Sequence, residues 1–364
     1  MQRRRASEPA SSARSTLKRT IDGICPLDDA AMAAARARQA QLTKPPGSLG
    51  VLEEISIRLA GICADPRPRI GAKSVIVCAG DHGVVAQGVS AYPQEVTGQM
   101  VANILAGGAA INVLARHVGA RVVVLDVGVV SDVSPSPTLV VRKVGRGTAD
   151  LSIGPAMDRD QAIASIAAGI EVAGCEVDRG ASVLATGEMG IGNTTPSSAI
   201  AAVLCRCPVA SVTGTGTGLD GEGRARKVAA IERGLTVNRP DASDPIDVLA
   251  KVGGFEIGAI AGVILGAAAR RVPVVVDGFI STAGALVAAA LAPEASAYVI
   301  ATHVSVEPGH RTMLDRLGLT PFFDVDFRLG EGTGAALALG FVEAACKILD
   351  EMATFEGAGV ADGR

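Results

Sequence analysis

Short runs of β-branched residues alternate with longer stretches of helical periodicity through most of the chain. The runs that we expect to form strands are 74–79, 121–127, 182–186, 209–213, 272–276 and 297–301. Between most of them lie Ala-rich segments, such as 96–117 and 159–179, in which apolar residues recur at helical spacing. This alternation is typical of a mostly parallel sheet that is covered by helices on both faces. We therefore predict a Rossmann-like three-layer α/β fold for residues 71–330.

The two ends of the chain follow a different pattern. Residues 28–42 and 51–63 have helical periodicity and are separated by Pro45 and Pro46, and an apolar helical run covers 335–349. We expect residues 21–70 and 331–364 to form a small helical subdomain against the α/β domain. Residues 1–20 are rich in Arg and Ser, as a transit peptide would be, but their pattern is not clearly amphipathic. We interpret them as a disordered extension.

Composition narrows the classes of function. Apolar residues make up 48% of the chain and charged residues 20%, so a large core is expected. A net charge of −3 gives no reason to expect a nucleic-acid partner, and no apolar run predicts a membrane span. The seven cysteines are scattered and odd in number, which favours reduced thiols in a cytoplasmic protein.

Most of the predicted strands are followed by loops rich in glycine and hydroxyl residues. These loops are 80–83 with 88–96, 187–195, 214–218, 277–282 and 303–310. In a parallel sheet, ligands bind where the strands end, and backbone N–H groups together with Ser and Thr hydroxyls suit a phosphate. The sequence therefore predicts a phosphate-containing ligand at this edge of the sheet.

Glu331 lies in Arg328-Leu-Gly-Glu-Gly-Thr-Gly334, between what reads as a strand end and the apolar run 335–349. The surrounding glycines permit positive φ and a close approach of a ligand to the backbone. A glutamate in this setting is either a catalytic base or a cap for the first helical N–H groups. Spacing alone leaves both interpretations open.

Other motifs were weighed against simpler explanations. The run 214–218 has the spacing G-x-G-x-G, which is a weak match to a dinucleotide fingerprint, and Lys227 on its own is explained by a solvated helix face. His82 is explained by a structural hydrogen bond. A magnesium-bound diphosphate is disfavoured because Asp277 has no adjacent acid. We expect neither a metal ion nor a cofactor.

Taken together, the motifs resemble the nicotinate-nucleotide:dimethylbenzimidazole phosphoribosyltransferase family, often called CobT. The matching segments occur in order from about residue 27 to 359, and they are 44–50, 79–83, 90–97, 187–195, 253–256, 277–278 and 328–336. The resemblance implies transfer of a 5-phosphoribosyl group from nicotinate mononucleotide to 5,6-dimethylbenzimidazole by a homodimer. The products would be α-ribazole 5′-phosphate and nicotinate.

The resemblance also implies roles for individual residues. Glu331 would take the proton of the acceptor base, and Glu188 would stabilise positive charge on the ribose. The residues expected around the base are Tyr92, Met100, Met189 and Leu329. Those expected around the nucleotide and its phosphate are Gly190, Asn193, Thr194, Gly214, Gly216, Lys227, Asp277, Ser305 and Gly330. Some family members differ at the positions of Tyr92 and Met100, so the acceptor is less firmly indicated than the reaction.

Two alternatives from other classes remain. One is a non-catalytic nucleotide-binding sensor, which would tolerate loss of the carboxylate at position 331. The other is a related phosphoribosyltransferase that acts on adenine or on phenolic acceptors. The presence of Glu331 disfavours the sensor.

Overall fold

A six-stranded, all-parallel sheet forms the centre of the part of the chain that the structure describes. The computed structural model describes residues 7–216 and 218–361. The strands are β1 (Ala72–Gly80), β2 (Ala120–Gly128), β3 (Leu139–Val141), β4 (Ala181–Met189), β5 (Val274–Val276) and β6 (Val299–Ala301). Their order across the sheet is β3-β2-β1-β4-β5-β6, so the direction of winding reverses between β1 and β4.

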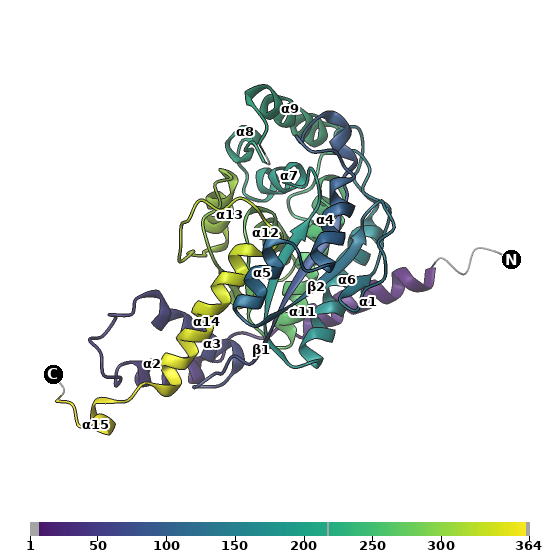
Figure 1. Cartoon of the computed structure of the whole chain (residues 1–364). Coiled ribbons are helices and arrows are strands. Elements are labelled where there is room, and N and C mark those ends of the chain that lie inside the picture. The colour runs from purple at the N-terminus through teal and green to yellow at the C-terminus, as the bar shows by residue number, and fades with distance from the viewer. Residues whose placement is uncertain (1–6, 217, 362–364) are drawn as a thin grey trace.

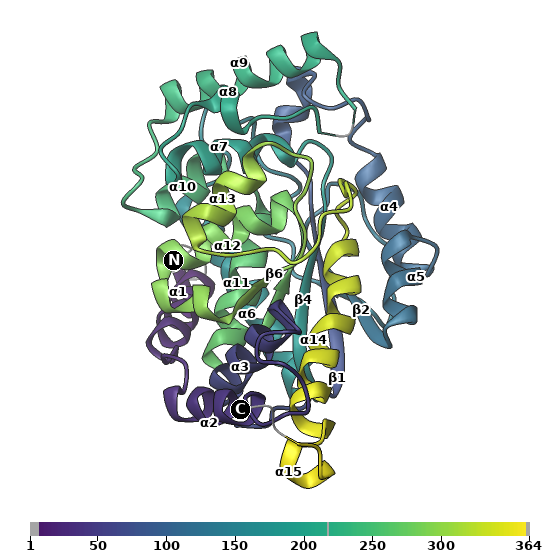
Figure 2. The ribbon, with the colours of Figure 1, turned by 90° about the vertical axis from the view of Figure 1, so that its left-hand side faces the viewer.

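Helices cover both faces of the sheet, as Figures 1 and 2 show. One layer contains α4 (Val96–Leu105), α5 (Ala110–His117) and α14 (Thr333–Glu351), and the other contains α6 (Arg159–Asp178), α11 (Phe255–Ala269) and α12 (Phe279–Leu291). Strands β1, β2, β4, β5 and β6 are buried along most of their length, because both faces are covered, whereas the edge strand β3 is only partly buried. The predicted Rossmann-like three-layer fold is confirmed.

The remaining helices lie around these three layers. They are α1 (Ser7–Asp22), α2 (Asp29–Gln39), α3 (Val51–Cys63), α7 (Thr194–Leu204), α8 (Val209–Val212), α9 (Gly221–Asn238), α10 (Pro245–Val252), α13 (Gly309–Leu317), α15 (Phe355–Ala358) and the 3₁₀ helices Gly83–Gln87 and Pro293–Tyr298. Helices α2 and α3 pack against each other and against the end of α14 around a separate small core of Ala31, Ala35, Ile57, Ala60 and Leu349. We interpret this cluster as the small helical subdomain.

Residues 7–20 do not form the expected disordered extension, because most of them belong to α1. Ala13, Leu17 and Ile21 recur every four residues and pack on the main core, and α1 contacts α6 and α11. Arg14 also pairs with Asp160 on α6. Residues 1–6 lie outside the described residues, so the expectation is corrected only for residues 7–20.

Residues 209–213 form the short helix α8 with Thr213 at its end, and the predicted strand there is wrong. Pro208 precedes the helix, the Thr213 hydroxyl donates to the Val209 carbonyl over 2.8 Å, and α8 packs against α7 and α9. Because a four-residue apolar run has no usable period, its β-branched residues indicated a strand only by composition. The sixth strand is instead β3, which the sequence did not indicate.

The apolar stretch Val96–His117 is long enough, by length and composition, to cross a membrane. In the structure it is broken at Gly107 and Gly108 into α4 and α5, of ten and eight residues. Ten helical residues extend about 15 Å, half the thickness of a hydrocarbon core. Their buried faces pack on the sheet and on α14. We therefore interpret the stretch as two core helices.

The crossing of α6 and α11 depends on glycines that let the two backbones touch. A Cβ at Gly169 would lie 1.9 Å from the Ala259 carbonyl oxygen, and one at Gly262 would lie 1.9 Å from that of Ile166. Any side chain at either position would force the two helices apart.

We therefore expect Gly169→Ala to lower the free energy of unfolding by about 1–3 kcal/mol or more. A matched control is Gly174→Ala on the same helix, where no atom lies within 4 Å of the added Cβ. The control should be stabilising by about 0.5–1 kcal/mol, because alanine favours the helix. Urea unfolding of both variants measures the difference, and equal effects would contradict the close crossing.

Candidate active site

Two adjoining cavities lie at the carboxyl ends of the strands, where the winding of the sheet reverses. We call the first the polar pocket; it has a volume of about 90 Å³ and is lined by the loops after β4, β5 and β6. The second, the apolar cavity, has a volume of about 690 Å³ and lies between α4 and α5 on one side and the loop after β4 and the segment 326–333 on the other. The two share Met189, Ile191, Gly216, Arg328 and Leu329 as walls.

Glu331 lies on the wall of the apolar cavity, in a turn of left-handed backbone. The φ angles of Gly330, Glu331 and Gly332 are 82°, 61° and 92°. Glutamate in this conformation is strained, and such strain persists where surrounding structure enforces it. Glu331 is 5% exposed, and its Oε2 has no hydrogen-bond partner among the described residues. Burial raises the pKa of Glu331, while the Ile111 backbone N–H opposes the rise.

Asp277 holds this turn in place. Its Oδ2 accepts from the Gly332 N–H over 3.1 Å, and its Oδ1 accepts from the Gly334 and Ala335 N–H groups over 2.8 and 3.0 Å. The carboxylate therefore caps the N-terminus of α14, where its charge also suits the helix dipole. Burial raises the pKa of Asp277, while neighbouring His303 and the backbone N–H groups lower it.

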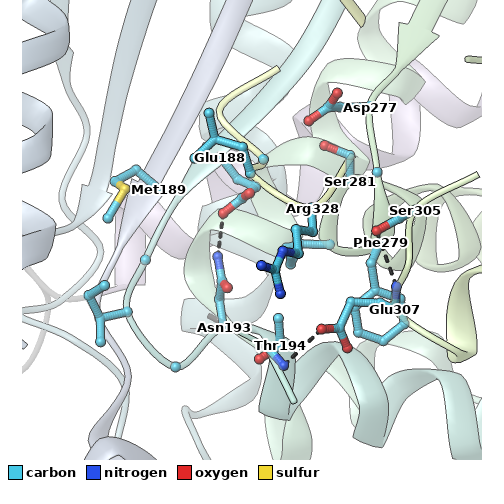
Figure 3. A pocket seen from close by; sticks show the side chains of 18 of the residues that line it. Glu188, Met189, Asn193, Thr194, Asp277, Phe279, Ser281, Ser305, Glu307 and Arg328 are labelled. Atoms are coloured by element: carbon cyan, nitrogen blue, oxygen red, sulfur yellow. Dashed lines mark hydrogen bonds between the residues drawn. The ribbon is translucent and has the colours of Figure 1, made fainter. Parts of the chain in front are cut away.

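Glu188, the second-to-last residue of β4, has a buried carboxyl group that faces the polar pocket (Figure 3). Its Oε2 accepts a hydrogen bond from the Asn193 amide. Asn193 is the N-cap residue of α7, but its side chain makes this hydrogen bond and does not cap the helix. Burial, with the charges of Asp277, Glu256 and Glu331, raises the pKa of Glu188 to about 8. The carboxyl is therefore mainly protonated at neutral pH.

Behind the Gly190 turn lies a second buried pair, His82 and Glu256. The His82 Nε2 lies 2.9 Å from the Glu256 Oε1, and both side chains are fully buried. A Cβ at Gly190 would lie 3.2 Å from the same Nε2. His82 thus has the structural hydrogen bond that was favoured for it, and it supports the turn from behind.

Lys227 is fully buried, so the interpretation of its side chain as a solvated helix face is wrong. Its ammonium donates to the Thr194 hydroxyl over 2.6 Å, and it lies close to Gly216. Burial lowers the pKa of Lys227 to about 8, although nearby Glu307 raises it. Glu307 in turn accepts from the Gly216 N–H over 2.8 Å. The loop after α8 is therefore held between α9 and the loop after β6.

A chain of hydrogen bonds through His310 joins the loops after β5 and β6. The Ser305 N–H donates to the His310 Nδ1 over 2.8 Å, so this nitrogen is an acceptor. The His310 Nε2 lies 2.9 Å from the Thr282 hydroxyl, which itself donates to the Gly278 carbonyl. This assigns the neutral tautomer with the proton on Nε2. Burial lowers the pKa of His310 to about 3, consistent with a neutral ring.

The four residues expected around an acceptor base all line the apolar cavity. Tyr92 and Leu329 are half exposed at its mouth, and Met100 and Met189 form part of its wall. Such a cavity of flexible apolar side chains beside the Glu331 carboxyl suits a flat, weakly polar ring.

The other residues predicted from the sequence either line the polar pocket or support its wall from behind. Those that line the polar pocket are Glu188, Gly190, Asn193, Thr194, Gly216, Asp277, Ser305 and Gly330. Gly214 and Lys227 do not line it; a Cβ at Gly214 would lie 2.2 Å from the Glu307 carboxylate. Sequence reasoning assigned no role to Phe279, Ser281, Glu307, His310 and Arg328. All five lie in the glycine-rich loops or in the Glu331 motif described above, and this location was the only feature of the sequence that indicated a place in the site.

The raised pKa of Glu188 has a consequence for stability. The folded protein keeps this carboxyl protonated up to a pH of about 8, whereas the unfolded chain ionises it near its ordinary value of 4.5. The contribution of this protonated carboxyl to the free energy of unfolding is fully present below pH 4.5 and is lost as the pH rises to about 8. Glu188→Gln should therefore lose less stability than the parent protein between these two pH values. Melting temperatures at both pH values test this, and the control Glu222→Gln, at an exposed position at the start of α9, should leave the pH dependence unchanged.

Comparison with known proteins agrees with this geometry. A family model described as Phosphoribosyltransferase matches residues 24–360. A nicotinate-nucleotide–dimethylbenzimidazole phosphoribosyltransferase of Roseiflexus sp. strain RS-1 is 61% identical over 346 residues, which are 95% of this chain and 98% of that protein. The protein of that name from Geobacter sulfurreducens is 57% identical over 347 residues, 95% of this chain and 99% of its own length. A crystal structure of the Thermus thermophilus enzyme aligns with a TM-score of 0.88 at 49% identity and covers 93% of this chain and 100% of that one. The chain therefore belongs to this phosphoribosyltransferase family.

Proposed function

We propose that this protein transfers the 5-phosphoribosyl group of nicotinate mononucleotide to 5,6-dimethylbenzimidazole. The products are α-ribazole 5′-phosphate and nicotinate, and the reaction belongs to cobalamin biosynthesis. The observation that carries the proposal is the position of Glu331. Glu331 lines an apolar cavity that adjoins a polar, glycine-lined pocket, and its buried Oε2 has no hydrogen-bond partner among the described residues.

The two cavities match the two substrates in polarity. A benzimidazole is flat and largely apolar, as the walls formed by Tyr92, Met100 and Met189 require. A phosphorylated ribose needs hydrogen-bond donors, which the loop around Asn193 and Thr194 supplies at the start of α7. Because the cavities share a wall at Leu329, the acceptor nitrogen and the anomeric carbon can meet there.

One proton acceptor is sufficient for this reaction. The nicotinate ring leaves as a neutral pyridine and needs no proton. The acceptor attacks through its lone-pair nitrogen, and its other ring nitrogen then loses a proton to Glu331. The raised pKa of Glu331 makes the carboxylate a stronger base than an ordinary glutamate, and burial keeps water from competing for it.

Glu188 has a supporting role in this mechanism. As the bond to nicotinate breaks, positive charge spreads over the ribose ring. A carboxyl with a pKa of about 8 is near the point of ionisation, so an approaching cation favours its charged form. The Asn193 amide already donates to the oxygen that would carry this charge. Glu188 is thereby suited to stabilise the transition state electrostatically.

The 5′-phosphate is proposed to bind where Thr194, Gly216 and Lys227 converge. Lys227 is too deeply buried to reach out, so it acts through the wall that Thr194 and Gly216 form. An incoming phosphate would keep its ammonium charged despite the lowered pKa. Ser305, held by His310, borders the same pocket.

Glu331→Gln tests the assignment of the base. The variant keeps the shape of the side chain and both cavities, so both substrates should still bind. Turnover should fall about 10²–10⁴-fold, the usual contribution of a general base. Turnover is measured by chromatography as the rate of nicotinate release with dimethylbenzimidazole as the acceptor. Near-normal turnover would leave Glu331 with only a structural role in the turn.

Asp277→Asn tests how that base is positioned. The Asp277 carboxylate now accepts hydrogen bonds from three backbone N–H groups, and an asparagine would place an NH₂ donor against at least one of them. Because that hydrogen bond is lost, we expect the free energy of unfolding to fall by about 1.5–3 kcal/mol. Turnover should fall because Glu331 loses its fixed orientation, while the KM for the nucleotide stays unchanged. If instead stability is unaffected and that KM rises, Asp277 contacts the nucleotide directly.

A panel of acceptors separates the proposal from the two alternatives. Dimethylbenzimidazole, adenine and a phenol are each incubated with the protein and nicotinate mononucleotide. Nicotinate release with dimethylbenzimidazole above the other two supports the proposal. Release with adenine or phenol alone indicates the related transferase, and binding without release indicates a sensor.

A homodimer in the cytoplasm is the setting that we propose for this reaction. The family resemblance supports the dimer. All seven cysteines are free thiols, as a reducing compartment would keep them. Light scattering of the purified protein tests the dimer, and cell fractionation tests the compartment.

A further inference from the structure

Arg328 is a charged side chain in this site for which the mechanism above has no use. It is exposed, and it lines both the polar pocket and the apolar cavity. Figure 3 shows its side chain projecting into the polar pocket. Within the described residues, no hydrogen bond or ion pair engages its guanidinium group. An arginine that faces a cavity with all its donors free is suited to bind an anion there.

The charges of the polar pocket make this arginine distinctive. The other ionisable side chains in its described lining are Glu188, Asp277, His303 and Glu307. Burial lowers the pKa of His303, so its ring is neutral at pH 7. Arg328 therefore supplies the positive charge of the lining itself, and Lys227 supplies a second one from behind the wall.

The proposed donor carries two anionic groups, a 5′-phosphate and a ring carboxylate. The phosphate is on C5′, away from the reacting carbon, whereas the nicotinate ring is attached directly to that carbon. Arg328 is three residues from Glu331 and borders the cavity where the acceptor meets the donor. Its position therefore suits the ring carboxylate, and that of Lys227 suits the phosphate.

On this basis, and resting on the proposed function, we propose that Arg328 binds the carboxylate of the nicotinate ring. It thereby determines that the donor is the acid nucleotide and not its amide. The planar guanidinium group can donate two parallel hydrogen bonds to a carboxylate, and a neutral carboxamide can accept at only one oxygen. The side chain would act on recognition of the leaving group, with no role in proton transfer.

The test compares nicotinate mononucleotide with nicotinamide mononucleotide, which share the ribose and the 5′-phosphate. The parent protein should favour the acid in kcat/KM by roughly 10- to 100-fold, the contribution of a charge-assisted hydrogen bond. Arg328→Gln should lower kcat/KM for the acid to about the level of the amide and leave the amide nearly unchanged. Arg328→Lys should fall between them. The melting temperature should not move, because the side chain has no partner to lose.

Lys227→Ala is the matched comparison. This substitution should lower kcat/KM for both nucleotides by the same factor, because both carry the phosphate. Equal losses for the two nucleotides in Arg328→Gln would show that Arg328 also binds the phosphate, and this would overturn the proposal. No preference for the acid in the parent protein would overturn it as well.

Calorimetric titration of the two nucleotides, without any acceptor base, separates this proposal from the proposed function. Tighter binding of the acid that is lost in Arg328→Gln supports the role of Arg328 even if no transfer to dimethylbenzimidazole is found. Equal affinities in the parent protein refute it even if transfer is fast.

Discussion

The carboxylate of Asp277 at the N-terminus of α14 is the contact on which the arrangement of the site depends. It lies at the end of a three-residue strand and accepts from three backbone N–H groups of the segment that carries Glu331. Without it, three consecutive residues with positive φ would have little reason to keep that conformation. Gly187 completes the fit from β4, because a Cβ there would lie 2.3 Å from the Glu331 carbonyl. Two strands and one helix thus fix one carboxyl group.

The sequence predicted the layers well because the relevant signals are local. Strands that are buried on both faces read as β-branched runs, and the helices between them keep a 3.6-residue period. The errors arise where a segment is short or its partner is distant. Residues 209–212 have no period to distinguish helix from strand, and β3 has three residues. The stripe of Ala13, Leu17 and Ile21 becomes meaningful only once α6 and α11 present a surface to it.

In the site, too, local features could be predicted from the sequence and contacts between distant segments could not. Glu331 and the glycine-rich loops could be found because unusual residue types cluster within a few positions. The contacts of Lys227, Glu307 and His310 could not, because each of them has a partner outside its own motif or loop. Lys227 meets Thr194, and Glu307 meets Gly216. Asp277 was expected beside the nucleotide because of the family resemblance, and it lines the polar pocket, but its hydrogen bonds to a segment more than fifty residues later could not be predicted.

The residues that form the walls of the apolar cavity differ from those that hold Glu331 in place, and this has an evolutionary consequence. Tyr92, Met100 and Leu329 touch the cavity without taking part in the contacts that Asp277 and Gly187 make. Substitutions at these wall positions can therefore accumulate without disturbing the turn that holds the carboxyl. A lineage can exchange one acceptor ring for another while its chemistry stays under purifying selection.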